Sequence, residues 1–145
     1  MADKMEEDIS PEEVAEIEEI IYEFFLKEYG SERKAQIMLG KLATFVEDPG
    51  VRLIHFGNTV FMMILVEPQV AEIHTMSVDE DSSTLAKHFV SLVKFLKEIG
   101  VKEAYTYTED PRFKAVAKRT RLPIETEEME AEDGKTYTIY RMRFE

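Results

Sequence analysis

Glu72 and His74 are the residues whose types and spacing best suit acid–base chemistry. They lie two positions apart in a strand-like run, Val70 to Val78, and such residues point to the same face of a sheet. A histidine beside a carboxylate can accept a proton from an amine, directly or through water. The polar face of a half-covered strand would show the same pattern, so both interpretations stay open. We take Glu72 and His74 as the candidate catalytic residues.

Ser82, Ser83 and Thr84 open a long amphipathic segment, directly after the carboxylates of residues 79–81. Hydroxyls and backbone N–H groups at a helix start can bind phosphate, but hydroxyls there also cap the helix. Three preceding carboxylates would repel an anion. We therefore keep capping and cofactor binding as alternatives for these three residues.

Arg112 belongs to a basic patch that could supply countercharge to an anion. The other members of the patch are Lys114, Lys118, Arg119 and Arg121. The patch could equally pair with the acidic hairpin expected at residues 122–144. Arg112 is nevertheless included, with Ser82, Ser83 and Thr84, among the candidate cofactor-binding residues.

Metal binding and several other site types find no support in the sequence. His55, His74 and His88 lack the short ligand spacing of a zinc motif, and the chain has no cysteine. No phosphate-binding Gly-x-Gly or Walker pattern and no nucleophile elbow appears. We expect no metal.

Composition narrows the function classes further. The chain has 145 residues and a net charge of −12, with eleven acids against two lysines in residues 1–30. This charge disfavours direct nucleic-acid binding, which needs a basic surface. No apolar run approaches the ~20 residues of a membrane helix, and no signal-peptide pattern is present. We expect a cytoplasmic protein, or one carried in a virion, with no membrane contact.

The apolar spacing predicts one α/β domain with a mixed, mostly antiparallel sheet flanked by helices. Residues 1–9 are expected to be disordered, residues 10–47 to form an acidic helical N-terminus, and residues 51–144 to form the core sheet with two helices. The expected helices are 10–29, 31–46, 83–99 and 111–120. The expected strands are 51–56, 59–66, 70–78, 101–108, 122–130 and 135–144.

This order of elements resembles the GNAT acyltransferase fold. The segment from Thr108 to Arg119, with Asp110-Pro111 opening a short helix, is similar to the family's segment after its fifth strand. Val78 looks like the valine that ends the family's fourth strand. The resemblance covers roughly Val51 to Phe144 and implies an acyl-CoA cofactor and transfer to an amine. Short, divergent chains of this family are frequent in bacteriophage genomes.

Two departures from the family's pattern bear on activity. The family's fourth strand ends in a glycine-rich loop that binds pyrophosphate, but residues 79–84 contain no glycine, arginine or lysine. The family also often places a tyrosine in the following short helix to protonate the leaving thiolate, and here the position is Ala117. Tyr105 and Tyr107, on the preceding strand, are the nearest alternatives.

We therefore expect a non-catalytic GNAT-like protein that acts through protein–protein interaction and takes no cofactor. The partner, or a second copy of the chain, would contact the helix from Ser10 to Tyr29, and a phage virion or host-takeover role would fit. The alternative is an active N-acyltransferase that uses acetyl-CoA. A third hypothesis is an acidic mimic of nucleic acid.

Overall fold

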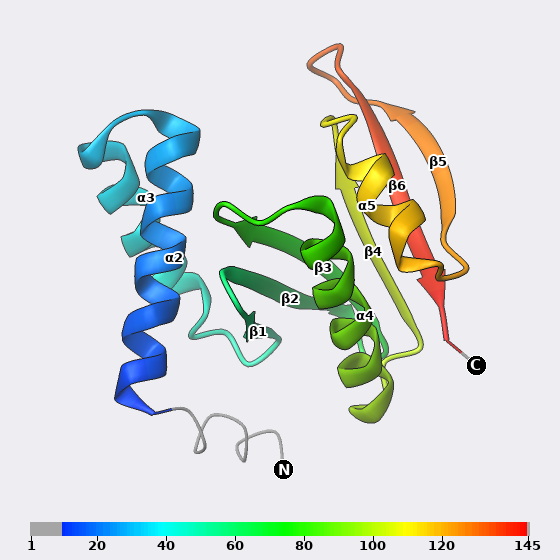
Figure 1. The fold of residues 1–145 in the computed structure, drawn as a ribbon, viewed down its shortest axis with the longest axis horizontal. Coiled ribbons are helices and arrows are strands. Elements are labelled where there is room, and N and C mark those ends of the chain that lie inside the picture. Colours follow the sequence, from blue (N-terminus) through cyan, green and yellow to red (C-terminus); the bar gives the residue numbers. More distant parts are fainter. Residues whose placement is uncertain (1–9, 145) are drawn as a thin grey trace.

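The computed structural model describes residues 10–144, and Figure 1 shows their arrangement. The expectation for residues 1–9 lies outside the described part. The helices are α2 (Pro11–Tyr29), α3 (Glu32–Phe45), α4 (Ser82–Glu98) and α5 (Phe113–Thr120). The strands are β1 (Val51–Phe56), β2 (Thr59–Glu67), β3 (Val70–Ser77), β4 (Glu103–Thr108), β5 (Glu125–Glu130) and β6 (Thr136–Arg143). The predicted mixed, mostly antiparallel sheet flanked by helices is confirmed.

The first helix begins and ends where its capping residues require. The Ser10 hydroxyl accepts the N–H of Glu13 at 3.1 Å, and Pro11 occupies the first turn. Gly30 ends the helix in the left-handed region, at φ 66°, and its N–H donates to the carbonyl of Leu26. The sequence places these boundaries correctly because capping is decided locally.

The six strands form one sheet in the order β1-β2-β3-β4-β6-β5. All neighbours are antiparallel except β3 and β4, which are parallel because α4 connects them. This parallel pair holds only three residue pairs, from Val70 with Glu103 to Glu72 with Tyr105. Beyond that point the two strands diverge, as Figure 1 shows, and the sheet opens toward their carboxyl ends.

The two faces of the sheet have separate hydrophobic cores, each covered by different helices. On one face, α4 packs on a core that contains Phe61, Ile73 and Leu92. On the other face, α2 and α3 pack on a second core around Val60 and Met76. The alternation of β2 and β3 residues between these cores is the period of two expected for strands buried on both faces.

One local expectation is corrected. The last helix begins at Phe113 rather than at residue 111, because Asp110 accepts the N–H of Arg112 in a turn that precedes it. Two details bear on the surface. Ile99, directly after α4, is 41% exposed, whereas Tyr22 and Leu26 of α2 are partly buried against the chain's own second core.

Candidate functional site

The divergence of β3 and β4 opens a cleft of about 1150 Å³ at the carboxyl ends of the two strands. His74 and Thr75 of β3 line one side of it, and Thr106 and Tyr107 of β4 line the other. Successive strand residues face opposite sides of a sheet. His74 therefore belongs to the α2–α3 side of the cleft, and Thr75 to the α4 side.

Glu72, His74 and Tyr105 form a hydrogen-bonded group where the strands separate. The carboxylate of Glu72 accepts from His74 Nε2 at 2.6 Å and from the Tyr105 hydroxyl at 3.1 Å. Because Nε2 carries the donated proton, Nδ1 is the nitrogen left to accept one in the neutral ring. The candidate catalytic pair is thus brought together, and Tyr105 joins it through the register of the parallel strands.

The Tyr105 hydroxyl is held in its protonated form. Burial raises the pKa of Tyr105 most, and the hydrogen bond to Glu72 and the charge of its carboxylate raise this pKa further. Tyr107 lies nearby and meets the His74 ring edge to face, with 5.9 Å between centroids. Tyr107 is 42% exposed and lines the cleft, so its hydroxyl is accessible to a ligand there.

Thr75 carries a polar atom without a partner. Its Oγ1 is buried and makes no hydrogen bond within the described residues, although it lies on a strand that lines the cleft. Buried hydroxyls are almost always hydrogen-bonded, so an unpaired one marks a place where a ligand or water completes the site. Sequence alone carries no signal for this, because whether a hydroxyl finds a partner depends on how the surrounding elements pack.

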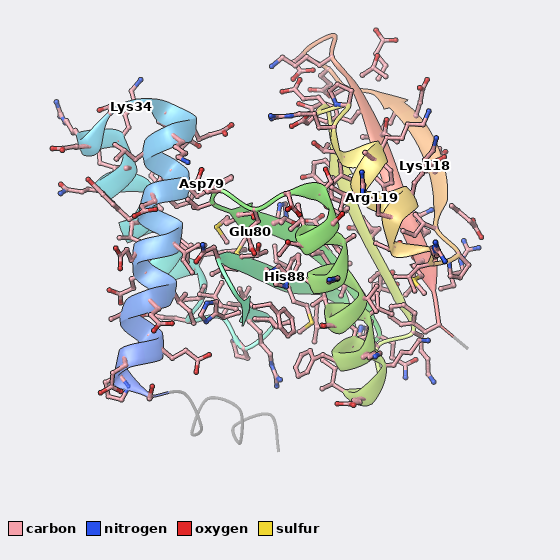
Figure 2. All side chains as sticks on the ribbon, in the orientation of Figure 1. Lys34, Asp79, Glu80, His88, Lys118 and Arg119 are labelled. Carbon is pink, nitrogen blue, oxygen red and sulfur yellow. The ribbon has the colours of Figure 1, made fainter. Side chains whose placement is uncertain are left out.

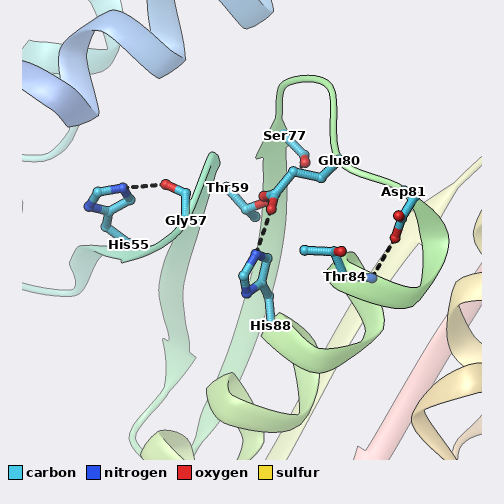
Figure 3. Close-up of polar contacts among 8 residues, drawn as sticks. All are labelled: His55, Gly57, Thr59, Ser77, Glu80, Asp81, Thr84 and His88. Carbon is cyan, nitrogen blue, oxygen red and sulfur yellow. Dashed lines mark hydrogen bonds and ion pairs between the residues drawn. The ribbon is translucent and has the colours of Figure 1, made fainter.

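Asp81 caps α4 at the end of the cleft. Its Oδ1 accepts the N–H of Thr84 at 2.7 Å (Figure 3), and this backbone bond is the main cause that lowers the pKa of Asp81. Because Asp81 caps the helix, the Ser82 and Ser83 side chains do not serve as the cap and lie in the first turn of α4. Arg119 of α5 donates to Ser83 Oγ at 2.8 Å. A guanidinium thus stands at the N-terminus of α4.

Glu80 turns into the protein instead of facing the cleft as a free charge. Its carboxylate accepts from His88 Nε2 at 2.8 Å and from the Thr59 hydroxyl, and only 9% of its side chain is exposed. Thr59 in turn accepts from the Ser77 hydroxyl at 2.8 Å, because its own proton is given to Glu80. Figure 3 shows the residues of this network and the bond from His88 to Glu80. The network joins the start of α4 to β2 and β3.

Asp79 also has a partner, so none of the three carboxylates in this loop is an isolated charge. It adopts the left-handed conformation at φ 53° and pairs with Lys27 of α2 at 2.6 Å. Figure 2 shows Asp79 and Glu80 at the β3–α4 turn and Lys118 with Arg119 on α5. Repulsion of an anion, which we expected from the run of carboxylates alone, is therefore weaker than their number implies.

The remaining cofactor candidate, Arg112, does not act at the helix start. Its guanidinium makes a bidentate pair with Asp110 at 2.8 and 3.0 Å, and its side chain is 89% exposed. Sequence reasoning placed Arg119 in the same patch but did not single it out. Arg119 lies three residues after Val116, which is buried near α4, and this helical spacing could have indicated that Arg119 reaches α4.

The basic patch and the acidic hairpin do not pair as expected. Among residues 10–144, no ion pair joins Lys114, Lys118 or Arg121 to residues 125–133. Within the same residues, no group of three or more His, Asp or Glu side chains could hold a metal ion. None of the described helices is both long and apolar enough to cross a membrane.

Comparison with known proteins identifies the fold. No protein-family model matches the sequence, and the search of curated proteins finds no match. Solved structures do match. A probable GNAT-family acetyltransferase from Chromobacterium violaceum is 13% identical, with 86% of this chain and 80% of that one covered and a TM-score of 0.63. The chain therefore has a GNAT-like fold.

Two further matches were solved with a cofactor. The ribosomal L7/L12 alpha-N-protein acetyltransferase RimL, in complex with coenzyme A, is 13% identical over 94% of this chain and 91% of that one, with a TM-score of 0.64. The microcin C7 self-immunity acetyltransferase MccE, in complex with acetyl-CoA and AMP, is 12% identical over 90% and 86%, with a TM-score of 0.62. These findings contradict our expectation that no cofactor is involved.

Two threonines of the cleft region are expected to respond in opposite ways to loss of the hydroxyl. Thr59→Val should lower the free energy of unfolding by about 1–3 kcal/mol, because it leaves the buried carboxylate of Glu80 with one donor fewer. Thr75→Val should leave stability unchanged or raise it, because no hydrogen bond is lost. Urea unfolding of both variants measures the difference, and a large destabilisation by Thr75→Val would show that its hydroxyl is already satisfied.

Glu72 is expected to control the ionisation of Tyr105. Glu72→Gln removes a negative charge and a carboxylate acceptor, both of which favour the protonated phenol, so the pKa of Tyr105 should fall toward its ordinary value. An NMR titration of ¹³Cζ-labelled tyrosine, assigned with Tyr105→Phe, follows it. The control is Glu98→Gln, on the far end of α4. An unchanged Tyr105 pKa in Glu72→Gln would contradict the contact.

Proposed function

We propose that the protein binds an acyl-CoA in the cleft between β3 and β4 and transfers the acyl group to an amine. The observation that carries this proposal is the cleft itself, with an unpaired hydroxyl on its α4 side and a Glu–His–Tyr group on its α2–α3 side. A cofactor can enter from one side of the sheet and an acceptor from the other.

Residues on the α4 side fit the chemical groups of CoA. The amides of its pantetheine arm can hydrogen-bond to the edge that β3 leaves unpaired beyond Glu72, and to Thr75 Oγ1. Its phosphates would lie by the N-terminus of α4, where the helix dipole and Arg119 supply positive charge. Ser82, Ser83 and Thr84 remain the candidates there, with Thr84 N–H already bound by Asp81.

The Glu72–His74 pair would act as the general base. When bound, the cofactor supplies a thioester, whose carbonyl carbon is attacked by the amine and whose sulfur departs as a thiol. His74 Nδ1 accepts the proton that the amine nitrogen loses as the amide bond forms. Glu72 stabilises the charged ring and fixes its tautomer through Nε2. Tyr105 holds the second oxygen of Glu72.

The departing sulfur needs a proton, and Ala117 cannot supply one. Tyr107 is the exposed hydroxyl of β4 that lines the cleft beside His74. We assign it the role of general acid, with its proton restored from His74 through solvent. The balance is then one amide and one thiol formed from one amine and one thioester.

A second candidate function is a non-catalytic protein that uses this cleft to contact a protein partner. Ala117, in place of a tyrosine, favours it. So does Asp81, whose carboxylate adds negative charge at the helix start where the phosphates would lie. One measurement separates the two candidates. The acyltransferase releases thiol from acetyl-CoA, whereas the non-catalytic protein does not.

Calorimetric titration with acetyl-CoA tests the proposed binding. We expect micromolar affinity, weakened about fivefold by Thr75→Val, because one hydrogen bond contributes roughly 1 kcal/mol. Asp81→Asn should tighten binding, since asparagine caps equally well without the charge. The matched control is Thr136→Val, the same change at an exposed residue of β6. Absence of heat at millimolar acetyl-CoA would refute the proposal.

A variant of Glu72 separates binding of the cofactor from the chemical step. Glu72→Gln should leave the affinity for acetyl-CoA unchanged and lower kcat by about 10²-fold or more, because it removes the partner of the base. Thiol release with a lysine-containing peptide as acceptor gives the rate. Cofactor binding with no thiol release in the wild-type protein would favour the non-catalytic candidate instead.

A further inference from the structure

The α2–α3 side of the cleft has apolar walls that are open to solvent. Phe24 and Phe25 of α2, Met38 and Phe45 of α3, and Met62 of β2 line it. Phe45 is 43% exposed, and Tyr107 on the opposite wall is 42% exposed. Aromatic and methionine side chains at the mouth of a cleft can pack on apolar side chains of many shapes.

The rim of this cleft is acidic. Its lining contains six carboxylates, Glu28, Asp79, Glu80, Asp81, Glu109 and Asp110, against two cationic side chains, Lys41 and Arg112. Three of these carboxylates have cationic partners: Asp110 pairs with Arg112, Asp79 with Lys27 and Glu109 with Lys135. Glu80 is turned into the protein, with 9% of its side chain exposed. The excess of negative charge at the rim therefore rests on Asp81 and Glu28. Glu28 of α2 has no ion-pair partner among residues 10–144. A cationic ligand is favoured at this rim.

The walls also offer unpaired backbone. Within the described residues, no strand pairs with the cleft edge of Ile73–Ser77 or of Thr106–Thr108. The proposed cofactor occupies the β3 edge, so the edge of Thr106–Thr108 is the one left to hydrogen-bond to an extended chain. Alternate side chains of that chain then enter pockets on either side. A small polyamine has no peptide groups for this edge and no apolar body for the aromatic walls.

We infer that the acceptor is a polypeptide: an extended basic segment that presents its amine, on a lysine or at its N-terminus, beside an apolar residue. Binding of this segment follows from the cleft alone. Its acylation rests on the proposed acyl transfer, with His74 placed on the same side of the sheet as the apolar walls. The segment's amine lies beside Tyr107 and His74, and its apolar residue packs on Phe45.

Fluorescence anisotropy with labelled peptides tests the binding without any cofactor. The probes are three peptides of equal length with a central lysine: one with phenylalanine and arginine neighbours, one with phenylalanine and glutamate, and one with serine and arginine. We expect the first to bind at least about tenfold more tightly than either of the others, since both charge and apolar contact contribute. Its affinity should fall as salt is raised.

Variants locate the site. Phe45→Ala should lower the affinity for the first peptide about tenfold, which is the effect of one lost aromatic anchor. The double variant Glu28→Gln, Glu109→Gln should remove the preference for the arginine peptide over the glutamate peptide. The matched controls are Ile37→Ala, an equally exposed residue of α3 outside the cleft, and Glu98→Gln on α4. Both controls should leave the affinity unchanged. Equal binding of the basic and acidic peptides, or equal effects of Phe45→Ala and Ile37→Ala, would overturn the inference.

Failure here and failure of the proposed function give different results. If acetyl-CoA does not bind but the basic peptide does, the acyl transfer is wrong and the peptide site stands. If acetyl-CoA binds and spermidine is acetylated in preference to the first peptide, the acyl transfer stands and the polypeptide acceptor is wrong.

Discussion

The short pairing of β3 with β4 is the constraint on which the site depends. Three residue pairs hold the two strands together, and the helix between them enforces their parallel direction. Because pairing stops at Glu72 and Tyr105, backbone edges and the Tyr107 ring become available to a ligand, and the buried, unpaired Thr75 hydroxyl lies on the same stretch of β3. The same stopping point puts Tyr105 against Glu72, which in turn holds His74. Further pairing of β3 with β4 would use up the backbone edges that now line the cleft.

Each of the three carboxylates in the β3–α4 turn interacts with a nearby group. Lys27 pairs with Asp79, His88 and Thr59 hold Glu80 inside, and Asp81 is used as a helix cap. The acidic turn is thus a structural element that joins α2, β2 and α4. Arg119 then adds a cation at the helix start. The net charge of −12 describes the whole chain and does not describe the potential at this point.

Local rules in the sequence predicted most of the fold. Caps such as Ser10 and Gly30, and the two-residue period that puts Glu72 with His74, depend only on neighbouring residues. The contact of Tyr105 with Glu72 depends on strand register, and the unpaired state of Thr75 depends on tertiary packing, so no local pattern predicts either. Arg119 was overlooked in favour of Arg112 because both lie in one patch, and only the three-dimensional arrangement separates them. The expectation of no cofactor was wrong because it counted the carboxylates of residues 79–81 without their partners. The phage origin and the partner of α2 stay predictions.

Amide hydrogen exchange, read residue by residue by NMR with and without coenzyme A, tests the central claim most directly. The account predicts that cleft-edge amides of Ile73–Ser77 and Thr106–Thr108 exchange faster in the free protein than amides of the same strands bonded to β2 and β6. It also predicts that coenzyme A slows exchange at these edges and at residues 82–85. Uniform protection of both strands in the free protein, or no change at saturating coenzyme A, would contradict it.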